Sequence, residues 1–87
     1  MQNRIEAKVR CQCPVDGAYD IYDLVIDSNE FIQIENIKTL ILRFKDLKMF
    51  QEDLTKSIAQ TLSHDSLTSY TVKTIGYHSG VKLTVTI

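Results

Sequence analysis

The chain has 87 residues, a formal net charge of −1 at pH 7 and 44% hydrophobic residues, which is the composition of a folded globular protein. We expect residues 1–87 to form one small domain, which alone would bury only roughly 60% of the surface of its unfolded chain. The charge excludes a general attraction to nucleic acid or anionic lipid, and the lack of a signal region or of an apolar run near ~20 residues predicts a cytoplasmic protein without a membrane span.

The first third of the chain predicts two strands joined by a turn. Apolar and charged residues alternate over residues 4–12, with the period of a half-buried strand. Its polar face carries Arg4, Lys8 and Arg10, which form either a solvated face or a surface for a phosphate backbone. A second strand is predicted over residues 19–27. Both of its faces are partly apolar, which predicts helices over one face and another subunit against the other.

The middle of the chain predicts two amphipathic helices. Asn36 is a suitable N-cap for the first, whose apolar residues recur at steps of three and four: Ile37, Leu40, Ile41 and Phe44. After a break at residues 45–48, a second helix is predicted over about residues 48–63. Its expected buried face consists of Phe50, Leu54, Ile58 and Leu62, with Gln51 and Glu52 elsewhere.

The final residues, 68–87, predict a β-hairpin whose strands meet near His78-Ser79-Gly80. The order of elements is therefore ββααββ, which indicates an α+β fold with a four-stranded antiparallel sheet and two helices on one face. Apolar residues remain on the other face of the sheet. They fit sheets that join edge to edge into a β-barrel between subunits.

The cysteines and histidines do not form a metal-binding motif. Cys11 and Cys13 are separated by one residue, which makes a disulfide between them difficult, and we expect both to be reduced. Together with His64 and His78 they match no usual zinc spacing, so we expect no metal. Cys11 is interpreted as a small core residue.

Cys13 and Asp20 are candidate catalytic residues because of their positions around a turn. Cys13 ends the first strand, Pro14 and Gly17 form the turn, and Asp20 begins the next strand seven residues after Cys13. A thiol is nucleophilic as its thiolate and must be accessible, which suits a strand end. A carboxylate nearby can exchange a proton with whatever the sulfur attacks. Both residue types are also common in turns, so the spacing alone is a modest indication.

Three motifs resemble the family of tunnelling-fold nitrile reductases that act on 7-cyano-7-deazaguanine (the QueF family) and, more closely, its short amidine-forming relatives, the QueF-like amidinotransferases. The segment from Cys13-Pro14 to Asp20 is similar to the family's Cys-Pro segment with its aspartate. The second motif, Phe50-Gln51-Glu52, is similar to Phe-His-Glu in the family, and the third, from Gly76 to Val81, to the turn of its final hairpin. The resemblance covers residues 10–87.

The resemblance implies a tunnelling fold (T-fold) that oligomerises into a β-barrel with active sites between subunits. It implies that Cys13 attacks the nitrile to form a thioimide, that Asp20 is the general acid and base, and that Glu52 binds the guanine-like edge of the base. Without it, Glu52 would be interpreted as an acid that stabilises a helix N-terminus. Gln51 and His78 are the other expected substrate contacts. Gln51 stands where the family has histidine, and it can hydrogen-bond but cannot carry a proton at neutral pH.

The chain departs from the reductases in residues 33–38, which retain only Lys38 of their nicotinamide-cofactor motif. We therefore expect no cofactor, and conversion of the nitrile to an amidine with ammonia is the leading hypothesis. Reduction by NADPH is one alternative, and a deazapurine-binding module without turnover is another. The base could be free or carried in tRNA or DNA, and the sequence leaves this open.

Overall fold

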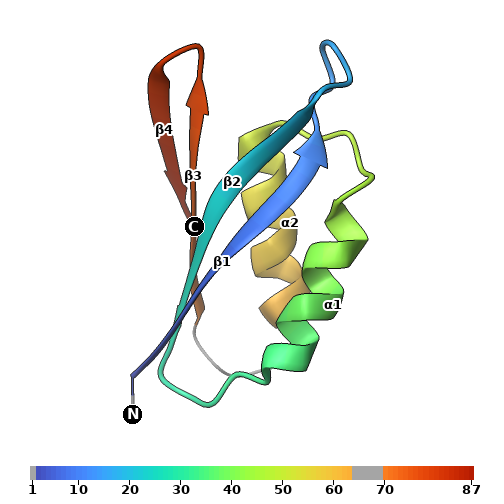
Figure 1. Ribbon diagram of the computed structural model, residues 1–87. Coiled ribbons are helices and arrows are strands. Elements are labelled where there is room, and N and C mark those ends of the chain that lie inside the picture. Colours follow the sequence, from blue (N-terminus) through green and yellow to red (C-terminus); the bar gives the residue numbers. More distant parts are fainter. Residues whose placement is uncertain (1, 64–69) are drawn as a thin grey trace.

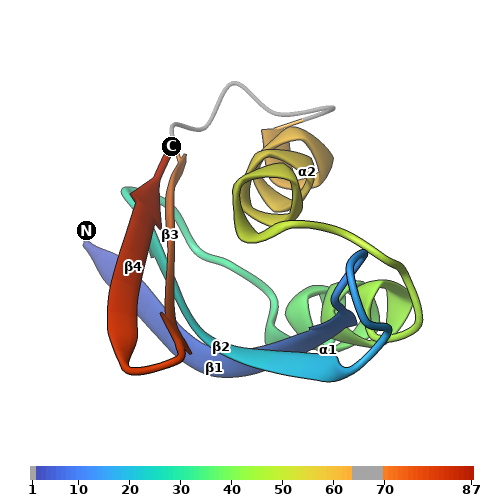
Figure 2. The same ribbon diagram turned by 90° about the horizontal axis from the view of Figure 1, so that it is seen from above.

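The computed structural model describes residues 2–63 and 70–87, which form the predicted order ββααββ (Figure 1). The elements are β1 (Asn3–Gln12), β2 (Tyr19–Ser28), α1 (Ile34–Phe44), α2 (Gln51–Ser63), β3 (Tyr70–His78) and β4 (Val81–Thr86). The strands pair antiparallel in the order β1-β2-β3-β4, and both helices lie on the same side of the sheet (Figure 2). The predicted α+β architecture is confirmed.

The core lies between this side of the sheet and the two helices. Its buried apolar residues are Val9, Cys11, Tyr22, Leu24, Ile26, Ile32, Ile37, Leu40, Phe44, Leu54, Ile58 and Val72. Cys11 is fully buried, as predicted. Neither helix in the described part of the chain is long and apolar enough to cross a membrane.

The three cations on the outer face of β1 each have a partner on β2. The pairs are Arg4 with Asp27, Lys8 with Asp23, and Arg10 with the ring of Tyr19. Nε of Arg4 lies 2.8 Å from Oδ1 of Asp27, and this hydrogen bond lowers the pKa of Asp27. Because two of the three cations face carboxylates, the structure favours the solvated-face interpretation over a surface for phosphates.

The first helix begins earlier than the sequence predicted. Its N-cap is Gln33 and its first residue is Ile34, so the prediction of Asn36 as the N-cap is wrong. The N–H of Asn36 donates to the carbonyl oxygen of Gln33 at 3.1 Å, which places Asn36 inside the first turn. Gln33 makes no side-chain capping bond, so the local cap signal was absent from the true start.

The second helix begins later than predicted, at Gln51 instead of residue 48. The linker before it extends beside the end of β1, where the N–H of Gln12 donates to Leu47 O at 2.8 Å and the N–H of Met49 donates to Gln12 O at 3.0 Å. Phe50, predicted on the buried face, therefore precedes the helix and is 51% exposed. Gln51, predicted away from that face, is buried with 3% exposure.

The final hairpin turns through Ser79 and Gly80, as predicted. Both have positive φ, at 52° and 83°, which is the geometry of a two-residue turn that matches the twist of the flanking strands. Residues 64–66, predicted to end the second helix, lie outside the described residues, and so does Thr68, predicted to begin the third strand. His64 falls in the same segment.

Candidate active site

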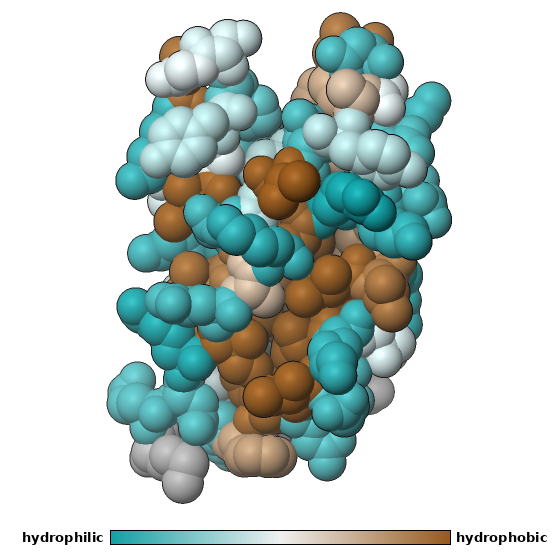
Figure 3. Space-filling view, viewed as in Figure 1, coloured by the Kyte–Doolittle hydropathy of each residue, from teal (hydrophilic) through white to brown (hydrophobic). Residues whose placement is uncertain are grey.

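The two hairpin turns and the start of α2 lie at the same end of the molecule (Figure 1). The space-filling view shows the two hairpin ends standing apart there (Figure 3). A cleft of about 340 Å³ at this end is lined by Cys13, Val15, Asp20, Tyr22, Met49, Phe50, Gln51, Glu52, His78 and Leu83. The five site residues expected from the sequence, which come from three separate parts of the chain, thus share one cleft.

A larger open groove of about 630 Å³ lies at the opposite end of the molecule, between the start of β1 and the start of α1. Its lining includes the exposed side chains of Phe31 and Ile34, together with Arg4 and Glu35. It contains no thiol or imidazole among the described residues. The smaller cleft is therefore the candidate active site.

Cys13 is the accessible thiol of the pair. It follows β1 directly, its N–H donates to Ala18 O at 2.7 Å, and its carbonyl accepts from the N–H of Gly17 at 2.8 Å. These bonds close the turn and hold the half-buried Cys13 at the cleft. The Cys11 thiol, in contrast, is buried and lies 3.6 Å from Met49 O. Burial raises the pKa of Cys11, which keeps this thiol neutral and unreactive.

Asp20 and Tyr22 form the wall of the cleft on β2. Both point to the helix side of the sheet, and Asp20 lies opposite Cys11 in the register of β1 and β2. The Tyr22 hydroxyl donates to Oδ2 of Asp20 at 3.3 Å. Burial of Tyr22, followed by the charge of Asp20, raises the pKa of the phenol. Tyr22 therefore remains a proton donor to Asp20 and limits the orientation of this carboxylate.

Gln51 lies at the base of the cleft in a buried polar network with β3 and β4. Its Nε2 lies 3.2 Å from both the carbonyl oxygen and Oγ1 of Thr74, and 3.0 Å from Leu83 O. Oγ1 of Thr74 in turn lies 2.6 Å from Oγ1 of Thr55. The Thr55 hydroxyl donates to the backbone carbonyl oxygen of Gln51 at 2.8 Å. The network joins the first turn of α2 to the final hairpin.

His78 contacts this network from the last residue of β3. Its Nε2 lies 2.9 Å from Oε1 of Gln51. The imidazole also packs against Tyr22, with ring centroids 5.9 Å apart and an interplanar angle of 46°. His78 is an exposed residue next to the turn, and these two contacts connect it to Gln51 at the base of the cleft and to Tyr22 on its wall.

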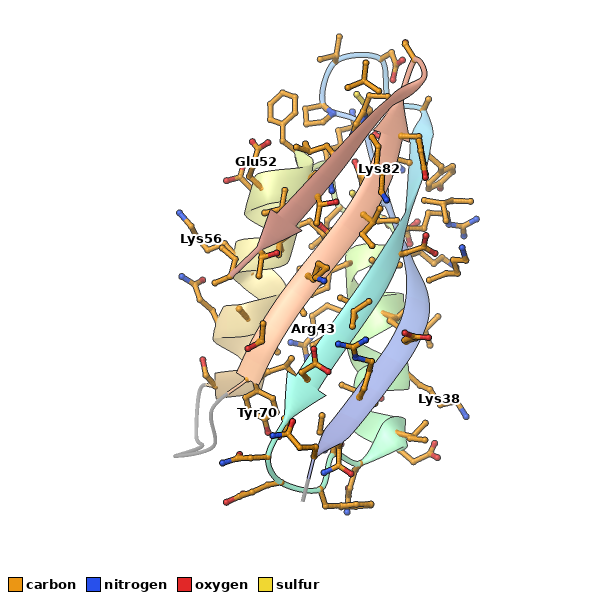
Figure 4. The ribbon with its side chains drawn as sticks, turned by 90° about the vertical axis from the view of Figure 1, so that its left-hand side faces the viewer. Lys38, Arg43, Glu52, Lys56, Tyr70 and Lys82 are labelled. Atoms are coloured by element: carbon orange, nitrogen blue, oxygen red, sulfur yellow. The ribbon has the colours of Figure 1, made fainter. Side chains whose placement is uncertain are left out.

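Glu52 and Phe50 lie at the rim. Glu52 is exposed on the first turn of α2, and Figure 4 shows it projecting past the edge strand β4, on the same side as Lys56 one turn later. Phe50 and Val15 add exposed apolar surface to the cleft. A flat aromatic ligand could pack on this surface while its N–H groups reach a carboxylate.

Sequence reasoning missed the roles of Tyr22 and Thr74. Tyr22 lies within the second predicted strand, and a buried tyrosine usually needs a hydrogen-bond partner. Asp20, two residues earlier on the same face, was the available polar group, so this pair could have been predicted. The contact of Thr74 with Gln51 had no comparable local signal because the residues are 23 positions apart.

The cleft combines three groups: an accessible thiol, an imidazole, and a carboxylate that is oriented by a phenol. This set can support nucleophilic addition with proton transfer. None of the described residues that line it is Lys or Arg. Within residues 2–63 and 70–87 there is also no group of three or more His, Cys, Asp or Glu side chains suited to a metal.

No protein-family model and no curated protein matches the sequence of this chain. Among solved structures, it is similar to a crystal structure of the archaeosine synthase QueF-like in its apo form. The TM-score is 0.90, the alignment covers 99% of this chain and 90% of the other, and the sequence identity is 16%. The chain therefore has the tunnelling fold of that protein, which confirms the fold expected from the motifs.

Proposed function

We propose that this protein is an enzyme that forms a covalent thioimide with 7-cyano-7-deazaguanine, free or within a nucleic acid, and converts the nitrile to an amidine with ammonia. The observation that carries the proposal is the meeting of Cys13 and Asp20 in one cleft at the β1–β2 turn. The likeness to an archaeosine synthase supports the same class of substrate. Glu52 at the rim supplies two acceptor oxygens for the N–H groups of the base.

The first step requires only the thiol and the carboxylate. Asp20 accepts the proton of the Cys13 thiol, and the thiolate attacks the nitrile carbon. One C≡N π bond breaks as the C–S bond forms, and the developing negative nitrogen takes the proton back from Asp20. The product is a neutral thioimide, and Asp20 returns to its carboxylate form. The Tyr22 hydroxyl, which donates to Oδ2, leaves Oδ1 for this exchange.

The second step consumes ammonia. Its nitrogen adds to the thioimide carbon, and the C–S bond breaks to release the Cys13 thiolate. The proton that the new ammonium group loses ends on this thiolate and restores the thiol. The carbon then carries one amino and one imino nitrogen, which is an amidine. The balance is one nitrile plus one ammonia for one amidine, with no oxidant or reductant.

Reduction by NADPH is the alternative for the same thioimide. The ammonia route is preferred because residues 33–38 retain only Lys38 of the reductase motif, so a cofactor phosphate would lack cationic partners there. Lys38 lies on α1, at the side of the molecule opposite Glu52 (Figure 4). Its Nζ lies 3.5 Å from Oε2 of Glu35. A binding module without turnover is the third possibility, favoured by the replacement of the family histidine by Gln51.

We also propose that copies of this chain associate. Figure 3 shows an apolar surface over β1 and α1. On α1, Ile34 and Leu42 are strongly exposed, and each lines a groove together with residues of β1. The strands β1 and β4 are the two open edges of the sheet, where a further strand can pair. A ring of subunits would cover both features, and the active sites would then lie between subunits.

Intact-protein mass spectrometry after incubation with 7-cyano-7-deazaguanine tests the proposal. The native chain should gain the mass of the ligand, Cys13→Ala should not, and Cys11→Ala should retain the adduct. Added ammonia should release the adduct and yield the amidine. Consumption of NADPH with release of an amine would favour reduction, and tight binding without adduct would favour a binding module. An adduct that persists in Cys13→Ala would overturn the assignment of the nucleophile.

A further inference from the structure

The amide group of Gln51 has one orientation that its surroundings permit. The carbonyl oxygens of Thr74 and Leu83 are acceptors only, and they lie 3.2 Å and 3.0 Å from Nε2. A rotated amide would place Oε1 against both carbonyls, with lone pair facing lone pair and two donors lost in a buried site. The NH₂ group of Gln51 must therefore face β3 and β4.

The hydroxyl groups of the network agree with this orientation. Thr55 uses its one hydroxyl proton to donate to the backbone carbonyl oxygen of Gln51 at 2.8 Å. In the 2.6 Å contact between the two threonines, Thr74 is then the donor and Thr55 the acceptor. Oγ1 of Thr74 has only lone pairs left for Nε2 of Gln51, 3.2 Å away. Three acceptor atoms, two on Thr74 and one on Leu83, thus face the NH₂ group and share its two hydrogens.

The orientation of Gln51 determines the tautomer of His78. Oε1 of Gln51 faces Nε2 of His78 at 2.9 Å, and an amide oxygen can only accept. Nε2 of His78 must therefore carry a proton in the neutral ring, which leaves Nδ1 as the basic nitrogen. No residue in the described part of the chain hydrogen-bonds this Nδ1, while the ring lines the cleft.

We propose that Gln51 is a positioning residue that holds His78 in its Nε2–H tautomer, and that Nδ1 of His78 is the nitrogen that exchanges a proton with a ligand in the cleft. Gln51 was expected to contact the substrate, but the side-chain NH₂ group and Oε1 of Gln51 are both hydrogen-bonded within the protein. The imidazole is supplied by β3, and its protonation leaves the bond to Gln51 intact because Nε2 donates in both states.

The chemical role of His78 rests on the proposed function. In the ammonia step, Nδ1 accepts one proton from the attacking nitrogen as the new C–N bond forms. After the C–S bond breaks, the imidazolium returns that proton to the Cys13 thiolate. The step is balanced, and it leaves Asp20 to the first step. The two steps then use two different bases in one cleft.

Nuclear magnetic resonance of the ¹⁵N-labelled protein tests the tautomer without any substrate. In alkaline solution, where the ring is neutral, the long-range ¹H–¹⁵N pattern of His78 should show the Nε2–H form alone. The chain has two histidines, so His78→Gln assigns the signals. Gln51→Met keeps the length of the side chain and removes the acceptor, and it should give a mixture of tautomers. A proton on Nδ1 in the native chain, or an unchanged single tautomer in Gln51→Met, would overturn the proposal.

A kinetic measurement tests the proton transfer separately. At constant free ammonia, the rate of amidine formation by the native chain should fall toward acid pH. His78→Gln should slow amidine formation by about 10²-fold or more and abolish this fall, while the adduct still forms. Gln51→Met should lower the rate but retain that pH dependence, because the imidazole remains. Retention of the pH dependence in His78→Gln would refute the role of Nδ1. If the native chain forms no adduct, the proposed function fails, and the resonance experiment still decides the positioning role of Gln51.

Discussion

Replacement of Gly76 by alanine is a direct test of how the site is packed. A Cβ at this position would lie 2.4 Å from Cδ1 and 2.6 Å from Cε1 of Tyr22, and 3.1 Å from Oε1 of Gln51. Ordinary contacts between carbon atoms are about 3.5–4.0 Å. The ring would therefore have to move by roughly 1 Å, and Tyr22 is only 2% exposed. The φ angle of Gly76 is not positive, so any cost of the added Cβ is steric and does not arise from backbone strain.

The expected cost of Gly76→Ala follows from two opposing effects. Overpacking a well-packed core raises the free energy of the folded state by typically about 1–3 kcal/mol. Alanine also restricts the unfolded chain, which stabilises the protein by about 0.4–1 kcal/mol. Taken at their midpoints, the two effects predict a loss of about 1.3 kcal/mol in the free energy of unfolding. For a domain of this size, each kcal/mol corresponds to a decrease of about 4–8 °C in Tm.

Urea unfolding followed by circular dichroism, at one protein concentration for all variants, measures this loss. Tyr22→Val removes both ring atoms that meet the new Cβ, so Gly76→Ala should be neutral or stabilising in that background. The difference between the two backgrounds is the coupling energy, expected at about 1–3 kcal/mol for residues in contact. A Gly76→Ala variant as stable as the native chain, or equal losses in both backgrounds, would refute the reasoning.

Three further predictions concern stability and association. Thr74→Val removes the hydroxyl that links Gln51 to Thr55 and should lower the free energy of unfolding by about 1–3 kcal/mol, whereas Thr71→Val, exposed on the same strand, should change it by less than about 0.5 kcal/mol. Folding raises the pKa of Tyr22 above its ordinary value of 10.0. The folded state then keeps a proton that the unfolded chain releases, so this stabilisation is complete below pH 10 and is lost as the pH rises further. In a pH series of urea unfolding, Tyr22→Phe should therefore reduce the fall in the free energy of unfolding above pH 10. Leu42→Lys, on the apolar surface over β1 and α1, should weaken association measured by light scattering, and a native chain that stays monomeric at every concentration would contradict the proposed ring.

The sequence determined the parts of the fold that depend on neighbours in the chain. The alternation in β1 and β2 indicates which side chains face the helices, and the stripe Ile37-Leu40-Phe44 indicates the inner face of α1, because strand and helix periods repeat within a few residues. The turn at Ser79 and Gly80 follows from the backbone freedom of glycine. The spacing of Cys13 and Asp20 likewise brings them together, because a short hairpin joins their strands.

The tertiary structure decided what depends on residues far apart. Bonds between Gln12 and the linker carry the chain past the predicted start of α2, so Phe50 becomes exposed and Gln51 buried. Nothing near Gln51 in the sequence indicates that its amide meets Thr74 and His78, which lie 23 and 27 residues later. Local periodicity predicts the face of an element, but the partners of a buried polar group depend on which strands pair, and that pairing is established only when the whole sheet forms.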